Sequence, residues 1–106
     1  MNSYLIGIDA GTTSMKGILV DDQGKMHASA CKEYQLDTPA NDICELDPEI
    51  YWKNAVQIIK DLIVTNSTDP ASIRGLAISS QGETLICVNR DGNPVRKAIV
   101  DRKSVV

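Results

Sequence analysis

Cysteine and histidine are scarce in this sequence and follow no ligand pattern. The three cysteines, Cys31, Cys44 and Cys87, are odd in number, and no two have Cys-x-x-Cys spacing. We therefore expect three reduced thiols rather than a disulfide framework. No pair of His, Cys or acidic residues has the spacing of a zinc site. The single histidine, His27, is expected to be a surface or packed side chain rather than a ligand.

Basic runs and long apolar runs are also missing. The net charge is −3 and no cluster of Lys and Arg occurs, which argues against nucleic acid as the main partner. The amino terminus has no basic start, and no apolar stretch is long enough for an export signal or a membrane span. We predict a cytoplasmic protein with no membrane partner.

The rest of the composition is typical of a small globular domain. The 106 residues are 42% hydrophobic and 24% charged, without repeats or low-complexity segments. A chain of this length suits a single domain with a modest core. We therefore treat residues 1–106 as one unit.

Hydrophobic patterning predicts three strands, a helix and two further strands. The helix begins at Asp47, with Pro48 in its first position, and carries an apolar stripe that includes Trp52. Trp52 is expected to be in the core rather than to be a sugar platform. This order indicates an α/β fold with a mixed sheet and a covering helix, not a doubly wound fold. The expected strands are Tyr4–Ile8, Lys16–Val20, Lys25–Glu33, Ile73–Ser79 and Thr84–Asn89; residues 34–46 are expected to be loop, and residues 90–94 a turn.

A small-residue turn between the first two strands has the composition of a phosphate-binding loop. Gly11, Thr12, Thr13 and Ser14 combine backbone N–H donors, close backbone approach and hydroxyl groups. The spacing of the glycines fits neither a Walker loop nor a Rossmann loop. The alternative is an ordinary tight hairpin turn, which also favours Gly, Ser and Asp.

These residues resemble the first phosphate motif of the FGGY carbohydrate kinases. Other segments are similar to that family in the same order along nearly the whole chain: Glu45-Leu-Asp47-Pro48 followed by Tyr51-Trp52, the strand Ile73–Ser79, the loop Ser80–Thr84, and Asp91–Ile99. The resemblance implies a ribonuclease-H-like core of the actin-like ATPase superfamily. It also implies that the chain is a partial amino-terminal lobe, without the carboxy-terminal lobe.

The resemblance implies ATP and Mg²⁺ as cofactors and assigns roles to residues. Asp9 would contact Mg²⁺ through water, and Gly11, Thr12, Thr13, Ser14 and Lys16 would bind the phosphates. The loop Gln81, Gly82 and Glu83 would face a sugar or polyol. The general base is expected beyond Val106, so no catalytic residue is assigned within the chain. One departure is the missing Trp of the family's W-x-D-x-R motif, where only Asp101 and Arg102 stand.

The implied function is that of an amino-terminal fragment of a kinase that transfers the ATP γ-phosphate to a sugar or polyol, in the xylulokinase-like substrate class. The chain alone is expected to be inactive. The alternative is a non-catalytic half-lobe that binds a partner or itself through an uncovered sheet edge.

Overall fold

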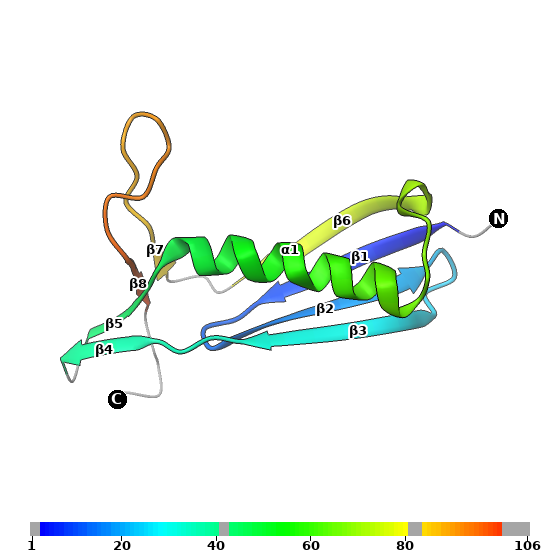
Figure 1. Cartoon of the computed structure of the whole chain (residues 1–106), viewed down its shortest axis with the longest axis horizontal. Coiled ribbons are helices and arrows are strands. Elements are labelled where there is room, and N and C mark those ends of the chain that lie inside the picture. The colour runs from blue at the N-terminus through cyan, green and yellow to red at the C-terminus, as the bar shows by residue number, and fades with distance from the viewer. Residues whose placement is uncertain (1–2, 41–42, 81–83, 101–106) are drawn as a thin grey trace.

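The computed structural model describes residues 3–40, 43–80 and 84–100, which form two small sheets and one long helix. The main sheet has the order β3-β2-β1-β6, and the second sheet has the order β4-β5-β8-β7. The helix α1 lies across one face of the main sheet (Figure 1). The strands of the main sheet are β1 (Tyr4–Ala10), β2 (Ser14–Asp21), β3 (Met26–Glu33) and β6 (Ile73–Ser80).

Strands β1, β2 and β3 form the antiparallel meander that the short connections predicted. The β2–β3 turn contains Gly24 with a φ of 84°, where glycine has no steric penalty. Asp21 closes this turn, because its carboxylate accepts the backbone N–H groups of Gln23 and Lys25 and the Nε2–H of His27. His27 is therefore a packed side chain, as the sequence indicated.

Helix α1 (Pro48–Thr65) begins where the sequence predicted. The carboxylate of Asp47 accepts the backbone N–H of Glu49 and so caps the first turn. Ile58 and Leu62 are fully buried against β2 and β3. The core consists of residues of β1, β2 and β3 that face the helix, the segment after β3, the helix stripe and residues of the second sheet: Ile6, Ile8, Met15, Leu19, Ala28, Tyr34, Leu36, Cys44, Leu46, Ile58, Leu62 and Val100.

The expected core position of Trp52 is wrong, because its side chain is 69% exposed. The stripe that packs on the sheet runs through Tyr51, Ala55, Ile58 and Leu62. Trp52 lies one residue further around the helix, at the border of the apolar face. Apolar spacing in the sequence identified the helix correctly but located the centre of its buried face about one position too far round.

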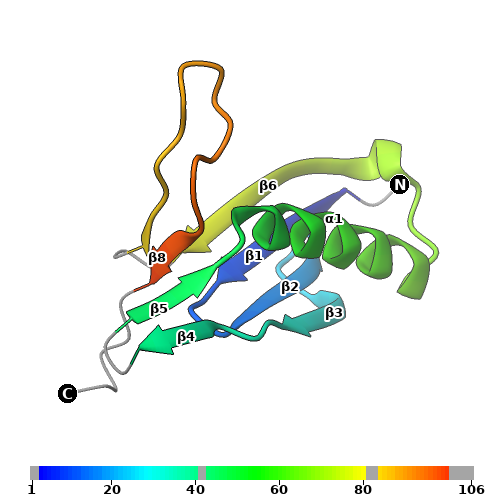
Figure 2. The ribbon, with the colours of Figure 1, turned by 60° about the vertical axis from the view of Figure 1, so that its left-hand side comes forward.

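The prediction that residues 34–46 are loop is also wrong. The strands β4 (Asp37–Ala40) and β5 (Ile43–Leu46) lie within this segment, and β5 pairs with β8 (Ala98–Val100). The expected strand Thr84–Asn89 is shorter than predicted: β7 covers only Thr84–Leu85, followed by an isolated bridge between Val88 and Pro94. Residues 86–97 project from the body as a hairpin arm (Figure 2), and residues 90–92 form its turn.

Candidate functional site

The turn between β1 and β2 is held closed at its base. The N–H of Gly11 donates to the carbonyl oxygen of Ser14 at 2.9 Å. A Cβ at position 11 would lie 3.0 Å from the same oxygen, which is tighter than ordinary contact and favours glycine. Within the part of the chain that the structure describes, the backbone N–H groups of Thr12 and Thr13 donate to no protein acceptor. The loop therefore presents amide donors that an anion can accept.

Tyr34 packs against this loop, and the sequence analysis did not single it out. Its hydroxyl has one proton, which the carbonyl oxygens of Gly11 and Ser14 can share, the latter at 3.0 Å, and its backbone N–H donates to the carbonyl of Thr13 at 3.0 Å. The ring is buried and meets the edge of Tyr51 of α1, with ring centroids 5.6 Å apart. A tyrosine just beyond a predicted strand was the only signal in the sequence.

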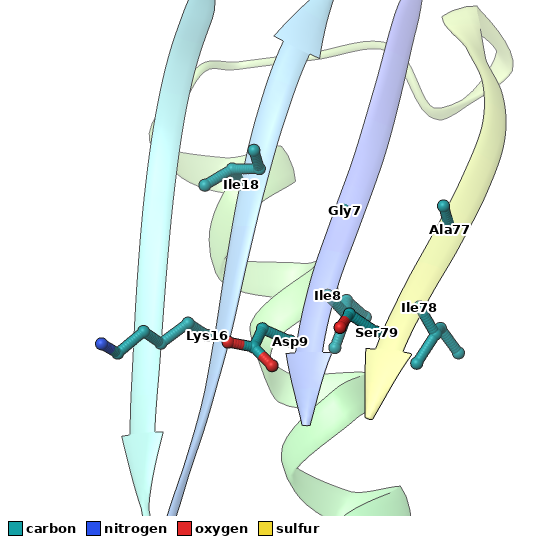
Figure 3. A pocket seen from close by; sticks show the side chains of 8 residues that line it. All are labelled: Gly7, Ile8, Asp9, Lys16, Ile18, Ala77, Ile78 and Ser79. Carbon is teal, nitrogen blue, oxygen red and sulfur yellow. The ribbon is translucent and has the colours of Figure 1, made fainter. Parts of the chain in front are cut away.

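Asp9 and Lys16 are directly opposite each other on β1 and β2. Both side chains are exposed on the face of the sheet away from α1, and Lys16 shares that face with Ile18, as strand alternation predicted (Figure 3). They do not form an ion pair among the described residues. Figure 3 shows the Lys16 side chain extending over β3, so its ammonium reaches the loop only after a change of rotamer.

A shallow hollow of about 410 Å³ lies beside these two side chains. Its polar lining comes from Asp9, Lys16 and Ser79, and its apolar lining comes from β1, β2 and β6. The hollow is therefore lined both by Asp9 and Lys16, which were predicted to contact Mg²⁺ and phosphate, and by the end of β6.

The end of β6 lies next to the start of the candidate phosphate loop. β1 and β6 are parallel, and Ala10 is paired with Ser80. Parallel neighbours end at the same edge of a sheet, about 4.8 Å apart. Gln81, Gly82 and Glu83, the predicted substrate residues, lie outside the described residues, as do Asp101 and Arg102.

The Glu45–Pro48 segment makes structural contacts. Asp47 is the helix cap described above, and Glu45 forms an ion pair with Arg96 at the base of the hairpin arm. A second pair joins Lys97 to Asp37 of β4, and this carboxylate raises the pKa of the Lys97 ammonium. These exposed pairs link the strand β8 to β4 and β5.

Comparison with known proteins places the chain in a family. The model for the FGGY family of carbohydrate kinases, N-terminal domain, matches residues 4–104. The chain belongs to this family, and its fold is that of a partial amino-terminal lobe of the actin-like ATPase type. Among the described residues, no helix is long and apolar enough to cross a bilayer.

The individual relatives are sugar and polyol kinases several times longer than this chain. The chain is 36% identical over 100 residues to glycerol kinase of Corynebacterium glutamicum (strain R), covering 93% of the chain and 20% of that protein. It is 36% identical over 99 residues to xylulose kinase of Lactococcus lactis subsp. lactis (strain IL1403), covering 92% and 20%. The crystal structure of gluconate kinase from Lactobacillus acidophilus superposes with a TM-score of 0.86 at 34% identity, covering 93% and 20%. The chain thus spans about a fifth of the relatives it matches.

Proposed function

We propose that this chain is the phosphate-binding, amino-terminal part of a cytoplasmic, ATP-dependent kinase for a sugar or polyol, of the xylulokinase-like substrate class. The observation that carries the proposal is the loop between β1 and β2, whose Thr12 and Thr13 amides have no acceptor in the described protein. Backbone N–H groups without a protein acceptor, beside hydroxyl side chains, suit a phosphate group. The membership of the FGGY family supports the reaction class.

The residues of the loop fit the phosphates of ATP. Gly11 lets the backbone approach closely, and the amides and hydroxyls of Thr12, Thr13 and Ser14 can donate to phosphate oxygens. Lys16 can add a point charge after its side chain turns. This set binds and orients the triphosphate, and positioning is the main contribution of a protein to phosphoryl transfer.

Asp9 is suited to a magnesium ion held mainly by phosphate and water. No cluster of three or more His, Cys, Asp or Glu side chains occurs among the described residues. Mg²⁺ commonly keeps several waters and takes only one or two carboxylates from the protein. The ion would neutralise phosphate charge, and Asp9 would orient its waters.

Gln81, Gly82 and Glu83 are proposed to contact the acceptor. Ser80, the residue before them, is paired with Ala10 at the edge that carries the phosphate loop. The carboxylate of Glu83 can accept hydrogen bonds from two hydroxyls of a sugar or polyol. The general base that takes the hydroxyl proton is expected beyond Val106.

Residue-resolved NMR titration tests the phosphate site. We expect Mg·ATP to shift the amide signals of Gly11, Thr12, Thr13 and Ser14 with millimolar affinity, and adenosine to leave them unchanged. Asp9→Asn should weaken the Mg·ATP effect, whereas Asp91→Asn, on the exposed arm, is the matched control. Loop signals that do not move at about 10 mM Mg·ATP, roughly tenfold above a dissociation constant of 1 mM, would refute the proposal.

The 106-residue chain is expected to lack sugar kinase activity by itself. It spans about a fifth of its relatives, and a phosphate loop provides only one wall of a kinase site. Coupled-enzyme detection of ADP should show no sugar-dependent release. Calorimetry should give an ATP dissociation constant no tighter than about 1 mM, since a triphosphate loop alone supplies few contacts. Sugar-dependent turnover by material free of host kinase would contradict this expectation.

A second candidate function is self-association, and the exposed apolar residues favour it. Leu76 and Ile78 on β6 are 47% and 63% exposed, and Val88 and Val95 on the arm are 55% and 60% exposed. β6 is also an edge strand of the described sheet, and such edges can pair with another chain. Sedimentation velocity distinguishes the cases, because a strict monomer at all concentrations would count against this function.

A further inference from the structure

The backbone and hydroxyl of Tyr34 together contact three of the four carbonyl oxygens of the phosphate loop. Its hydroxyl contacts the carbonyl oxygens of Gly11 and Ser14, and its backbone N–H contacts the carbonyl of Thr13. The ring is only 8% exposed. Tyr34 lies just after β3, so it reaches the loop from the other end of the meander.

The direction of a peptide carbonyl determines the direction of the next amide. In a planar trans peptide the C=O and N–H groups point in opposite directions. When Tyr34 holds the carbonyl of Gly11, the N–H of Thr12 must point away from the tyrosine. When Tyr34 holds the carbonyl of Thr13, the N–H of Ser14 must do the same. The N–H of Thr12 is thus turned to the side of the loop away from Tyr34, where no acceptor among the described residues receives it.

The surroundings of the Tyr34 hydroxyl also keep it protonated, so it remains a hydrogen-bond donor. Burial, with smaller effects of Tyr51 and Asp9, raises the pKa of the Tyr34 phenol to about 12. A phenol with the ordinary pKa of 10 is already protonated at neutral pH, and this shift keeps the Tyr34 hydroxyl a donor in more alkaline solution as well. The Tyr34 ring packs in a T-shaped arrangement with the ring of Tyr51, near the start of α1. Its position is therefore fixed by α1 as well as by the end of β3.

We propose that Tyr34 is a positioning residue for phosphate binding, whose hydroxyl holds the Gly11 carbonyl so that the Thr12 amide faces the anion. This inference rests on the proposed phosphate site. Without the hydroxyl, the carbonyl of Gly11 loses its protein donor, and the Gly11–Thr12 peptide is free to rotate. A carbonyl oxygen turned toward a phosphate repels it, so anion binding weakens even though Tyr34 itself does not contact the anion.

The test compares the wild-type chain with Tyr34→Phe in NMR titrations with Mg·ATP and with inorganic tripolyphosphate. Losing one neutral hydrogen bond predicts a roughly three- to tenfold weaker affinity for both probes. Tripolyphosphate lacks the nucleoside, so an equal loss for both probes assigns the effect to phosphate contacts. The amide signal of Thr12 should also change in the absence of any ligand.

Two further chains separate positioning from simple structural damage. Tyr4→Phe removes a tyrosine hydroxyl at the far end of β1 and should leave both affinities unchanged. Replacing Tyr34 with 4-aminophenylalanine keeps a donor at the same place and should restore binding to within about threefold of wild type. If Tyr34→Phe fails to fold, the 4-aminophenylalanine chain still tests whether a donor at this position supports phosphate binding.

The outcomes distinguish this inference from the function on which it rests. Wild-type loop signals that do not respond to either probe would defeat the proposed phosphate site and this inference together. Wild-type binding that Tyr34→Phe matches within twofold would overturn the role of Tyr34 alone. A folded 4-aminophenylalanine chain with binding as weak as Tyr34→Phe would also overturn it.

Discussion

Gly17 is the position in β2 where a single methyl group should cost the most stability. It lies under α1, between Ile8 of β1 and Ala30 of β3. A Cβ at this position would lie 2.3 Å from Cγ2 of Ile58 and 3.3 Å from Cδ1 of Leu62. The first distance is more than about 1 Å inside the ~3.5–4.0 Å at which carbon atoms attract one another. Ile58 is fully buried, so it has no open space into which it can move.

Gly17→Ala should therefore lower the free energy of unfolding by about 1–3 kcal/mol, the usual cost of overpacking a core. For a domain of this size, each kcal/mol lowers the melting temperature by roughly 4–8 °C. Urea unfolding followed by far-ultraviolet circular dichroism measures the change. A Gly17→Ala chain with the wild-type midpoint would refute the close packing of α1 on β2.

A matched glycine and a second-site change make the test specific. Gly75→Ala on β6 would place its Cβ at an ordinary 3.4 Å from Leu5, so stability should change by no more than about 0.5–1 kcal/mol. Ile58→Leu removes the Cγ2 methyl at nearly constant volume and should cost less than about 1.5 kcal/mol alone. In the Gly17→Ala chain it should instead recover at least about 1 kcal/mol, a coupling that a double-mutant cycle detects.

Three further expectations concern surface and core side chains. The hydrogen bond from His27, followed by that from the Lys25 backbone, lowers the pKa of Asp21 from an ordinary 3.8 to about 2. The ionised Asp21 carboxylate therefore stabilises the fold above pH 3.8, and this stabilisation is lost as the pH falls from 3.8 to about 2. The melting temperature should fall more over this pH range for wild type than for Asp21→Asn, and parallel curves would contradict this. In urea titrations, Trp52→Ser should change stability by less than about 0.5 kcal/mol, whereas Leu62→Ala should cost about 2–5 kcal/mol. Arg96→Ala breaks an exposed ion pair with Glu45 and should cost no more than about 1 kcal/mol in the same assay.

The elements that the sequence predicted well are those with local signals. The meander of β1, β2 and β3 has short connections, and the start of α1 has a cap and a proline that act within one turn. Asp9, Lys16 and the Gly11–Ser14 loop lie within one hairpin, as predicted, and their roles toward phosphate and Mg²⁺ stay predictions.

The features that the sequence missed depend on distant partners. β5 has only four residues, and it is stabilised by β8, where Glu45 is paired with Ile99. The role of Tyr34 depends on the return of β3 to the loop after β1, and a buried hydroxyl is recognised only when its acceptors are known. The exposure of Trp52 depends on the exact rotation of α1 on the sheet, which apolar spacing determines only approximately.

The pairing of β1 with β6 has a consequence for the order of folding. Tyr4 is paired with Ile73 across the whole meander and α1, whereas β1 pairs with β2 and β2 pairs with β3, which are consecutive along the chain. Closing such a long segment carries an entropic cost that a hairpin avoids, so distant strand pairs generally form later. β6 is thus expected to dock last and to open first in hydrogen exchange. The loop after β1 would then form before β6, the strand that precedes Gln81, has docked on the sheet.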